Sequence, residues 1–201
     1  MSESRQPPNP ANGFRLAVLV EGAIGLVAVG LAQLFGISLS DQFPATRAGW
    51  LDGLTAGVVA TLPMLLVFGW MLYSRWGPLV GLREQVQRMI GELFPNAGIA
   101  ELATIAALAG VGEELMFRGV LQTGIAEWTT PVTGLVAASV IFGALHAVTR
   151  LYFALATLIG LFLGWLLMEF HDLTIPIVAH GLYDFVALLY LTRNPPDETL
   201  L

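Results

Sequence analysis

Six segments of the sequence are almost entirely apolar, and each is about as long as a helix that crosses a lipid bilayer. They cover residues 16–39, 51–73, 99–126, 132–149, 151–170 and 173–192. A helix rises about 1.5 Å per residue, so about 20 residues cross a hydrocarbon layer about 30 Å thick. The pattern predicts an all-α fold, a polytopic membrane helix bundle of about six transmembrane helices.

Between the second and third apolar segments lies a stretch with a different pattern, from Leu79 to Phe94. Apolar residues recur there every three to four positions, and charged or amide residues fill the positions between them. This spacing is typical of an amphipathic helix that lies on the membrane surface. Pro95 and Gly98 then end it. A gating or regulatory helix and a simple linker helix packed on the bundle are both compatible with the pattern.

We divide the chain into four parts and find no internal repeat and no soluble domain. Residues 1–14 are predicted to be a disordered cytoplasmic tail, because this end is polar, rich in proline and unlike a signal peptide. Residues 15–98 hold two transmembrane helices and the interfacial helix. Residues 99–192 hold a four-helix core, and residues 193–201 form a C-terminal tail.

The composition supports the membrane prediction and excludes several classes of function. Hydrophobic residues make up 56% of the 201 residues and charged residues only 12%, whereas a soluble domain carries about 25% charged residues. The net charge of −6 argues against nucleic-acid binding, which needs a basic surface. Without cysteine there is no thiolate site or cysteine nucleophile, and without lysine there is no lysine-dependent catalysis.

The arginines indicate how the helices are oriented. If the N-terminus is cytoplasmic, Arg47 lies outside and Arg118 lies within a span, and seven arginines lie on the inner side: Arg5, Arg15, Arg75, Arg83, Arg88, Arg150 and Arg193. Basic residues accumulate on the cytoplasmic side of membrane proteins. We therefore expect cytoplasmic N- and C-termini, in the inner membrane of a bacterium.

Three charged side chains lie inside the third apolar segment, at Glu113, Glu114 and Arg118. Each costs about 2.5–3.5 kcal/mol at the centre of a bilayer when it is unpaired. Glu114 and Arg118 are four residues apart, so on a helix they can form an ion pair on one face. That pair leaves Glu113 without a structural reason, which favours a functional site.

Two histidines and an aspartate extend this polar set into later segments. His146 lies in the fourth segment, and His180 and Asp184 lie one helical turn apart in the sixth. Polar side chains in a membrane turn away from lipid and towards one another. We therefore expect one inward-facing cluster, although straight spans would place Glu113 at mid-membrane, His146 near the inner end and His180 nearer the outer end.

Two kinds of chemistry fit such a cluster. In the first, the imidazoles and one carboxylate hold a divalent metal such as zinc, with the candidate ligands His146, His180, and Glu113 or Glu114, and the other glutamate is the general base. In the second, a glutamate and a histidine activate water without a metal, and the second histidine stabilises the oxyanion. The HExxH metalloprotease motif and the Gly-x-Ser-x-Gly elbow are both absent.

Three motifs of this set resemble the CPBP intramembrane proteases, also called Abi-type proteins. They are Glu-Glu-x-x-x-Arg at 113–118, Phe-x-x-x-His at 142–146 and His-x-x-x-Asp at 180–184. That family includes the eukaryotic CAAX prenyl endopeptidase and bacterial lysostaphin-resistance and bacteriocin-immunity proteins. The resemblance covers residues 99–192.

The resemblance implies a helical bundle whose polar cavity opens to the cytosol and holds a peptidase site. Glu113 would activate water with His146, and Glu114 would pair with Arg118. His180 and Asp184 would stabilise the oxyanion, although the family often has asparagine at the position of Asp184. The family is often labelled a metalloprotease family, and a metal-free glutamate mechanism is favoured for its eukaryotic branch.

We therefore expect a membrane endopeptidase that cuts a peptide or protein C-terminus entering from the inner leaflet or the cytosol. Two alternatives remain open, a non-catalytic immunity or scaffold protein and a proton-coupled transporter. Among the other polar residues, Glu21 is expected to reach the inner interface or to meet Arg15 or Arg75. His171 is expected to lie in a solvated outer turn and not to be a ligand.

Overall fold

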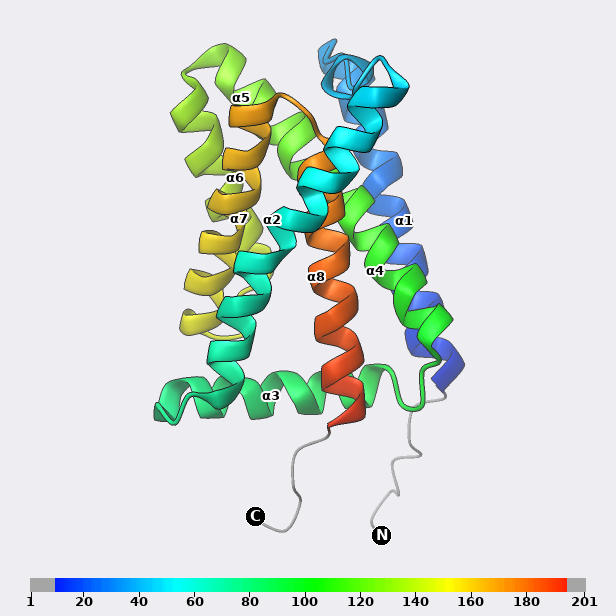
Figure 1. Cartoon of the computed structure of the whole chain (residues 1–201), viewed down its shortest axis with the longest axis vertical. Helices are drawn as coiled ribbons and strands as arrows, with labels where there is room; N and C mark the ends of the chain where they lie inside the picture. The colour runs from blue at the N-terminus through cyan, green and yellow to red at the C-terminus, as the bar shows by residue number, and fades with distance from the viewer. Residues whose placement is uncertain (1–9, 195–201) are drawn as a thin grey trace, which may run out of the picture.

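The computed structural model describes residues 10–194, which form helices joined by short connections (Figure 1). These helices are α1 (Pro10–Phe35), α2 (Arg47–Tyr73), α3 (Gly77–Leu93), α4 (Ile99–Glu114), η2 (Leu115–Gln122), α5 (Thr123–Trp128), α6 (Pro131–Leu145), α7 (Arg150–Phe170) and α8 (Thr174–Arg193), with a short 3-10 turn, η1 (Ser40–Gln42). The described residues contain no strand, so the all-α prediction is confirmed. Of the predicted tails, residues 1–9 and 195–201 lie outside the described part, and α1 already begins at Pro10.

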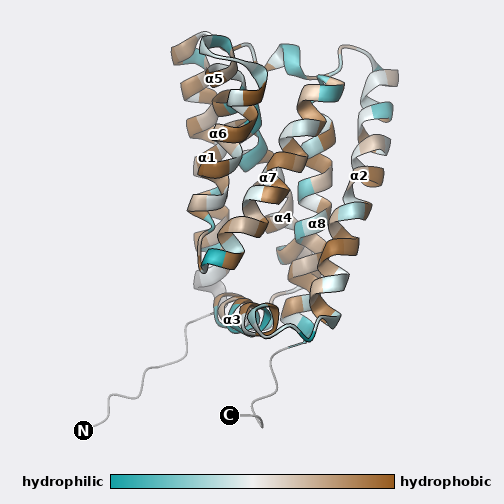
Figure 2. Ribbon diagram, turned by 90° about the vertical axis from the view of Figure 1, so that its left-hand side faces the viewer, coloured by the Kyte–Doolittle hydropathy of each residue, from teal (hydrophilic) through white to brown (hydrophobic). Residues whose placement is uncertain are grey.

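The chain is an integral membrane protein. The helices α1, α2, α7 and α8 are each long and apolar enough to span a bilayer. The predicted third span is one continuous helical run built from α4, η2 and α5, and α6 is a shorter apolar helix of 15 residues. Large apolar side chains face outwards, for example Leu26 and Leu66 at 76% and 75% exposure, and hydrophobic residues recur along the helices in Figure 2. This exposure is unfavourable in water and favourable in lipid.

The amphipathic segment forms α3, which lies across one end of the bundle, roughly at right angles to the other helices (Figure 1). Its residues Leu79 and Leu82 are buried. The side chain of Gln87 donates a hydrogen bond of 2.8 Å to the carbonyl of Asn194, which ties α3 to the end of α8. Both ends of the described chain lie at this end of the bundle (Figure 1).

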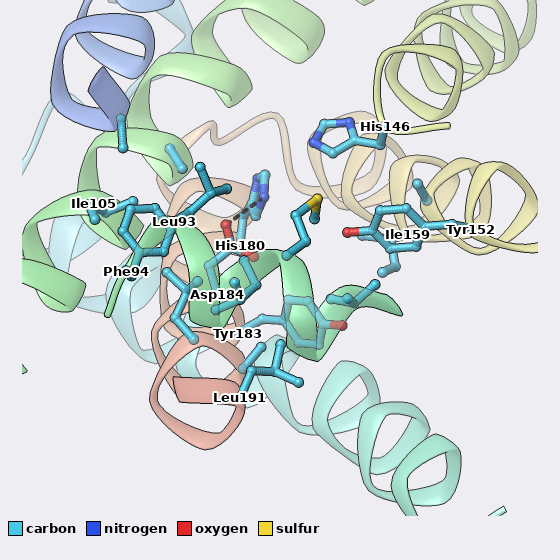
Figure 3. A pocket seen from close by; sticks show the side chains of 18 of the residues that line it. Leu93, Phe94, Ile105, His146, Tyr152, Ile159, His180, Tyr183, Asp184 and Leu191 are labelled. Atoms are coloured by element: carbon cyan, nitrogen blue, oxygen red, sulfur yellow. Dashed lines mark ion pairs between the residues drawn. The ribbon is translucent and has the colours of Figure 1, made fainter. Parts of the chain in front are cut away.

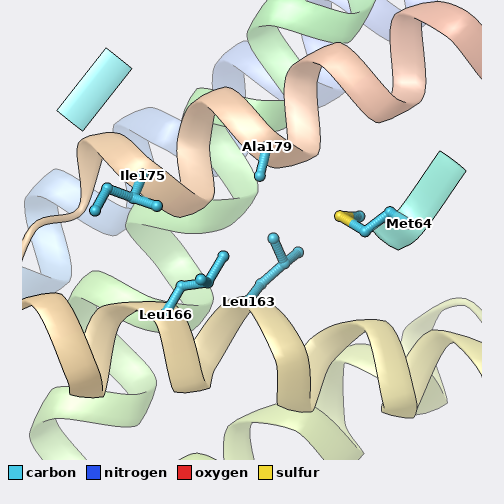
Figure 4. Packing of buried hydrophobic residues seen from close by; sticks show 5 residues of the cluster. All are labelled: Met64, Leu163, Leu166, Ile175 and Ala179. Atoms are coloured by element: carbon cyan, nitrogen blue, oxygen red, sulfur yellow. The ribbon is translucent and has the colours of Figure 1, made fainter. Parts of the chain in front are cut away.

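Glycines allow the central helices to approach closely. A Cβ atom on Gly110 of α4 would lie 2.8 Å from the backbone nitrogen of Gly181 in α8, and one on Gly112 would lie 2.6 Å from the carbonyl oxygen of Glu21 in α1. Small residues at such crossings let helix backbones come into contact in membranes. On the other side of the bundle, the cluster Met64, Leu163, Leu166, Ile175 and Ala179 joins α2, α7 and α8 (Figure 4).

Two of the helices do not cross the whole bundle, and this brings the polar residues to one depth. The α6–α7 hairpin ends before the lower end of α8 (Figure 1), and His146, the C-cap of α6, lines the same cavity as Glu113 and His180. At the other end, α8 begins within the bundle: Leu173 and Thr174 are buried, and the Leu173 amide donates to the carbonyl of Gln42 at 2.8 Å. The separation in depth expected from straight, full-length spans is therefore wrong.

Candidate active site

Glu114 and Arg118 form a sealed ion pair where α4 continues into η2. Their oxygen and nitrogen are 2.7 Å apart, and the two residues are only 0% and 1% exposed. Arg118 also donates to the carbonyl of Gly160 in α7 at 3.1 Å and stacks its guanidinium over the Phe142 ring at 4.7 Å. The predicted i,i+4 contact is therefore present, and it also holds α6 and α7 against the third span.

The segment η2 is π-helical, which the sequence pattern did not predict. π-Helical turns are rare, and they occur frequently at functional sites. Here the segment carries both Arg118 and Gln122, whose amide donates to the carbonyl of Gly164 at 2.9 Å. Two side chains four residues apart thus bind two α7 carbonyls that are also four residues apart. Gln122 was not predicted from the sequence. The signal that could have found it is that Arg118 and Gln122 are separated by four residues, as are Gly160 and Gly164.

His180 of α8 lies between three carboxylates. Its Nδ1 is 2.7 Å from Glu114 Oε1, within hydrogen-bonding distance. Its Nε2 is 3.3 Å from Asp184 Oδ2 and 3.8 Å from Glu113 Oε2. Figure 3 shows the ion pair between His180 and Asp184 at the edge of the cavity.

His146 approaches Glu113 from the opposite side. It is the C-cap of α6, and its Nδ1 lies 2.8 Å from the carbonyl oxygen of Phe142. Because a carbonyl only accepts, Nδ1 carries the hydrogen, and Nε2 of the neutral ring keeps its lone pair. This Nε2 lies 3.7 Å from Glu113 Oε1. The Phe142 ring lies against both His146 and His180, with centroid separations of 4.4 and 5.9 Å.

These side chains line a cavity of about 410 Å³ that extends from the site towards α3. Apart from the polar groups, its walls are largely apolar residues of α1, α2, α3, α7 and α8 (Figure 3). Glu21 of α1 is also part of the wall. A contact of Glu21 with Arg15 or Arg75 was expected, but within the described residues Glu21 forms no ion pair with either arginine. Its Oε2 is buried without a hydrogen-bonding partner. Sequence reasoning therefore misplaced Glu21.

The structure brings all six candidate residues into one cluster: Glu113, Glu114, Arg118, His146, His180 and Asp184. The donor types would suit zinc. However, within residues 10–194 no three histidine, aspartate or glutamate side chains converge closely enough to hold a metal ion. Glu114 in particular is already engaged by Arg118 and His180. Zinc binding by these residues stays a prediction, and the mechanism proposed for the site uses water without a metal.

Comparison with known proteins confirms the resemblance found in the three motifs. Residues 95–186 match the family model described as type II CAAX prenyl endopeptidase Rce1-like, and this range includes all six candidate residues. The uncharacterized protein YpbD of Bacillus subtilis (strain 168) is 35% identical over 98 residues. That match covers 47% of this chain and 48% of YpbD, so the chain matches about half the length of this relative. No solved structure matches the chain.

Proposed function

From the match of residues 95–186 to the CAAX prenyl endopeptidases, we propose that this membrane protein is an endopeptidase that hydrolyses a peptide bond with water activated by Glu113 and His146. The observation that carries the proposal is the position of Glu113. Its two carboxylate oxygens face His146 Nε2 at 3.7 Å and His180 Nε2 at 3.8 Å, beside the cavity. These distances are too long for direct hydrogen bonds and leave room for a water bound to both partners.

Glu113 and His146 would act as general bases on that water. Glu113 is only 8% exposed, and its Oε2 makes no hydrogen bond within the described residues. The water oxygen would attack the peptide carbonyl carbon as its proton moves to Glu113. When the tetrahedral intermediate collapses and the carbon–nitrogen bond breaks, Glu113 would return this proton to the leaving amine.

His180 is the proposed donor to the oxyanion. With a hydrogen on both ring nitrogens, His180 donates to Glu114 through Nδ1 and presents Nε2–H to the cavity. Carboxylate oxygens of Glu114 and Asp184 lie 2.7 Å and 3.3 Å from the two nitrogens of this ring. Asp184 only accepts when ionised, so it cannot bind the oxyanion itself. We assign it a positioning role that acts through His180.

The substrate is proposed to enter from the α3 end of the bundle, which faces the cytosol. Arg15, Arg75, Arg83, Arg88, Arg150 and Arg193 lie at or near that end, and Arg47 lies at the other. This distribution follows the positive-inside rule. It makes both termini cytoplasmic and allows a peptide or protein C-terminus to enter from the cytosol or the inner leaflet of a bacterial inner membrane.

Peptide cleavage by the purified protein in detergent tests the proposal. Wild type, Glu113→Ala and His146→Ala are incubated with C-terminal peptides, with and without a lipid modification, in the presence and absence of a chelator. We expect cleavage by wild type alone, unchanged by the chelator. Loss of cleavage with chelator and its rescue by zinc would overturn the metal-free mechanism. Equal cleavage by both variants would overturn the site assignment, and no cleavage by any protein would favour a binding protein.

A further inference from the structure

We propose that Glu21 binds a positively charged side chain of the substrate, lysine or arginine, next to the bond that is cut. Glu21 lies on α1, outside residues 95–186, so the family match does not assign it a role. The inference deepens the proposed function and rests on it, because it concerns the peptide that Glu113 would hydrolyse.

Glu21 lies close to the proposed catalytic residues. At the α1–α4 crossing, the carbonyl oxygen of Glu21 lies within 2.6 Å of where a Cβ on Gly112 would be, so α1 contacts the turn that precedes Glu113. The Glu21 side chain lines the same cavity as Glu113 and Asp184. A substrate placed for attack at Glu113 would therefore have its neighbouring residues within reach of Glu21.

The cavity wall holds more acidic than basic side chains. Three carboxylates line it, Glu21, Glu113 and Asp184. Among the residues that the structure describes, the only arginine in the wall is Arg83, which already donates to the carbonyl of Leu72. Arg118 lies behind Glu114 and does not line the cavity. Even with a charged His180, the carboxylates outnumber the cations that can reach them.

Two carboxylate oxygens in the cavity wall lack a hydrogen-bonding partner in the part of the chain that the structure describes. Glu113 is more than nine-tenths buried. Within the described residues, neither Glu113 Oε2 nor Glu21 Oε2 has a hydrogen-bonding partner. A carboxylate at membrane depth is costly unless a cation or a donor compensates it. Lysine and arginine side chains are the permanent cations of a peptide, and they form charge-assisted hydrogen bonds with carboxylates. An acidic substrate residue at this place would be repelled.

Matched peptides test the inference on the full-length protein. A cleaved peptide is resynthesised with lysine, norleucine or glutamate at each of the three positions on either side of the scissile bond. For wild type we expect kcat/KM to be about tenfold higher with lysine than with norleucine at one position, which is the size of one charge-assisted hydrogen bond. Glu21→Gln should bring this ratio close to one, and Glu21→Arg should favour glutamate.

The control variant is Glu92→Gln, which removes the same charge from an exposed position of α3 outside the cavity wall. It should leave the lysine-to-norleucine ratio as in wild type. If Glu21→Gln lowers cleavage of both peptides by the same factor, Glu21 has no role in charge selection and the inference is overturned. Equal cleavage of both peptides by wild type would also overturn it.

Binding separates this inference from the proposed function. Fluorescence anisotropy of the labelled peptides is measured on His146→Ala, which keeps all three carboxylates but should not cleave. Tighter binding of the lysine peptide that is lost when Glu21→Gln is added supports charge recognition by Glu21. If wild type at the same time cleaves nothing, only the peptidase proposal fails. Equal binding of the two peptides, or binding of neither, overturns the inference.

Discussion

Replacing Arg118 with methionine would remove one partner of a sealed ion pair. The Arg118–Glu114 separation is 2.7 Å at 1% and 0% exposure, and the guanidinium also binds the Gly160 carbonyl and covers the Phe142 ring. Breaking a buried pair on one side costs about 3–5 kcal/mol, because the remaining charge stays buried. His180 still reaches Glu114 at 2.7 Å, so we expect a cost of about 3 kcal/mol, near the lower end.

The measurement is thermal unfolding in detergent, followed by tryptophan fluorescence and circular dichroism. At about 2–4 °C per kcal/mol for a chain of this size, the midpoint of Arg118→Met should fall by about 6–12 °C. Arg47→Met, at an exposed position, should leave it unchanged within about 1 °C. Adding Glu114→Gln removes the stranded charge, so the double variant should be more stable than the sum of the single effects predicts. Additive effects, or a loss below about 1 kcal/mol for Arg118→Met, would refute the reasoning.

Two further predictions concern the α6–α7 crossing and the orientation of the bundle. A Cβ on Gly143 would lie 2.0 Å from Thr157 Oγ1 and 2.9 Å from the Phe153 carbonyl oxygen. Gly143→Val should therefore displace His146. We expect peptide cleavage to fall at least about tenfold while the helicity of the protein is retained. Gly69→Val, where a Cβ meets nothing within 4 Å, is the control and should retain activity. Because the chain has no cysteine, single cysteines report topology: an impermeant maleimide should label Glu92→Cys only from the cytoplasmic side and Arg47→Cys only from outside. The reverse labelling would contradict the proposed orientation.

The spacing of residues along the chain was sufficient to predict the local features of this protein. The apolar segments and the amphipathic pattern correspond to helices in the structure, because both signals arise from contacts within one turn or one element. The Glu114–Arg118 pair followed in the same way from a separation of four residues. Likewise, polar residues on separate helices were expected to converge because lipid leaves them no other partners.

The depth of each helix in the bundle and the contacts between helices could not be predicted from the pattern of apolar and polar residues. The hydropathy of α6 does not reveal that this helix ends inside the bundle, and that of α8 does not reveal that it begins there, since both ends are apolar. The cavity position of Glu21 depends on the close approach of α1 to α4 at Gly112, a contact between residues far apart in sequence. The π-helical turn was equally hidden, because Leu115–Gln122 has no unusual composition and its geometry becomes visible only when Arg118 and Gln122 bind α7.

The exposure of the clustered side chains separates the sealed Glu114–Arg118 ion pair from the side chains that line the cavity. Arg118 and Glu114 are sealed, with side chains 1% and 0% exposed. The side chains that line the cavity are more exposed, from 5% for His180 and 10% for Glu113 to 28% for Asp184 and 30% for His146. A charge needs permanent partners where water cannot reach it, whereas a general base must reach the water that it deprotonates. Substitution at the sealed end should therefore reduce stability first, and substitution of Glu113 or His146 should reduce activity in a protein that remains folded.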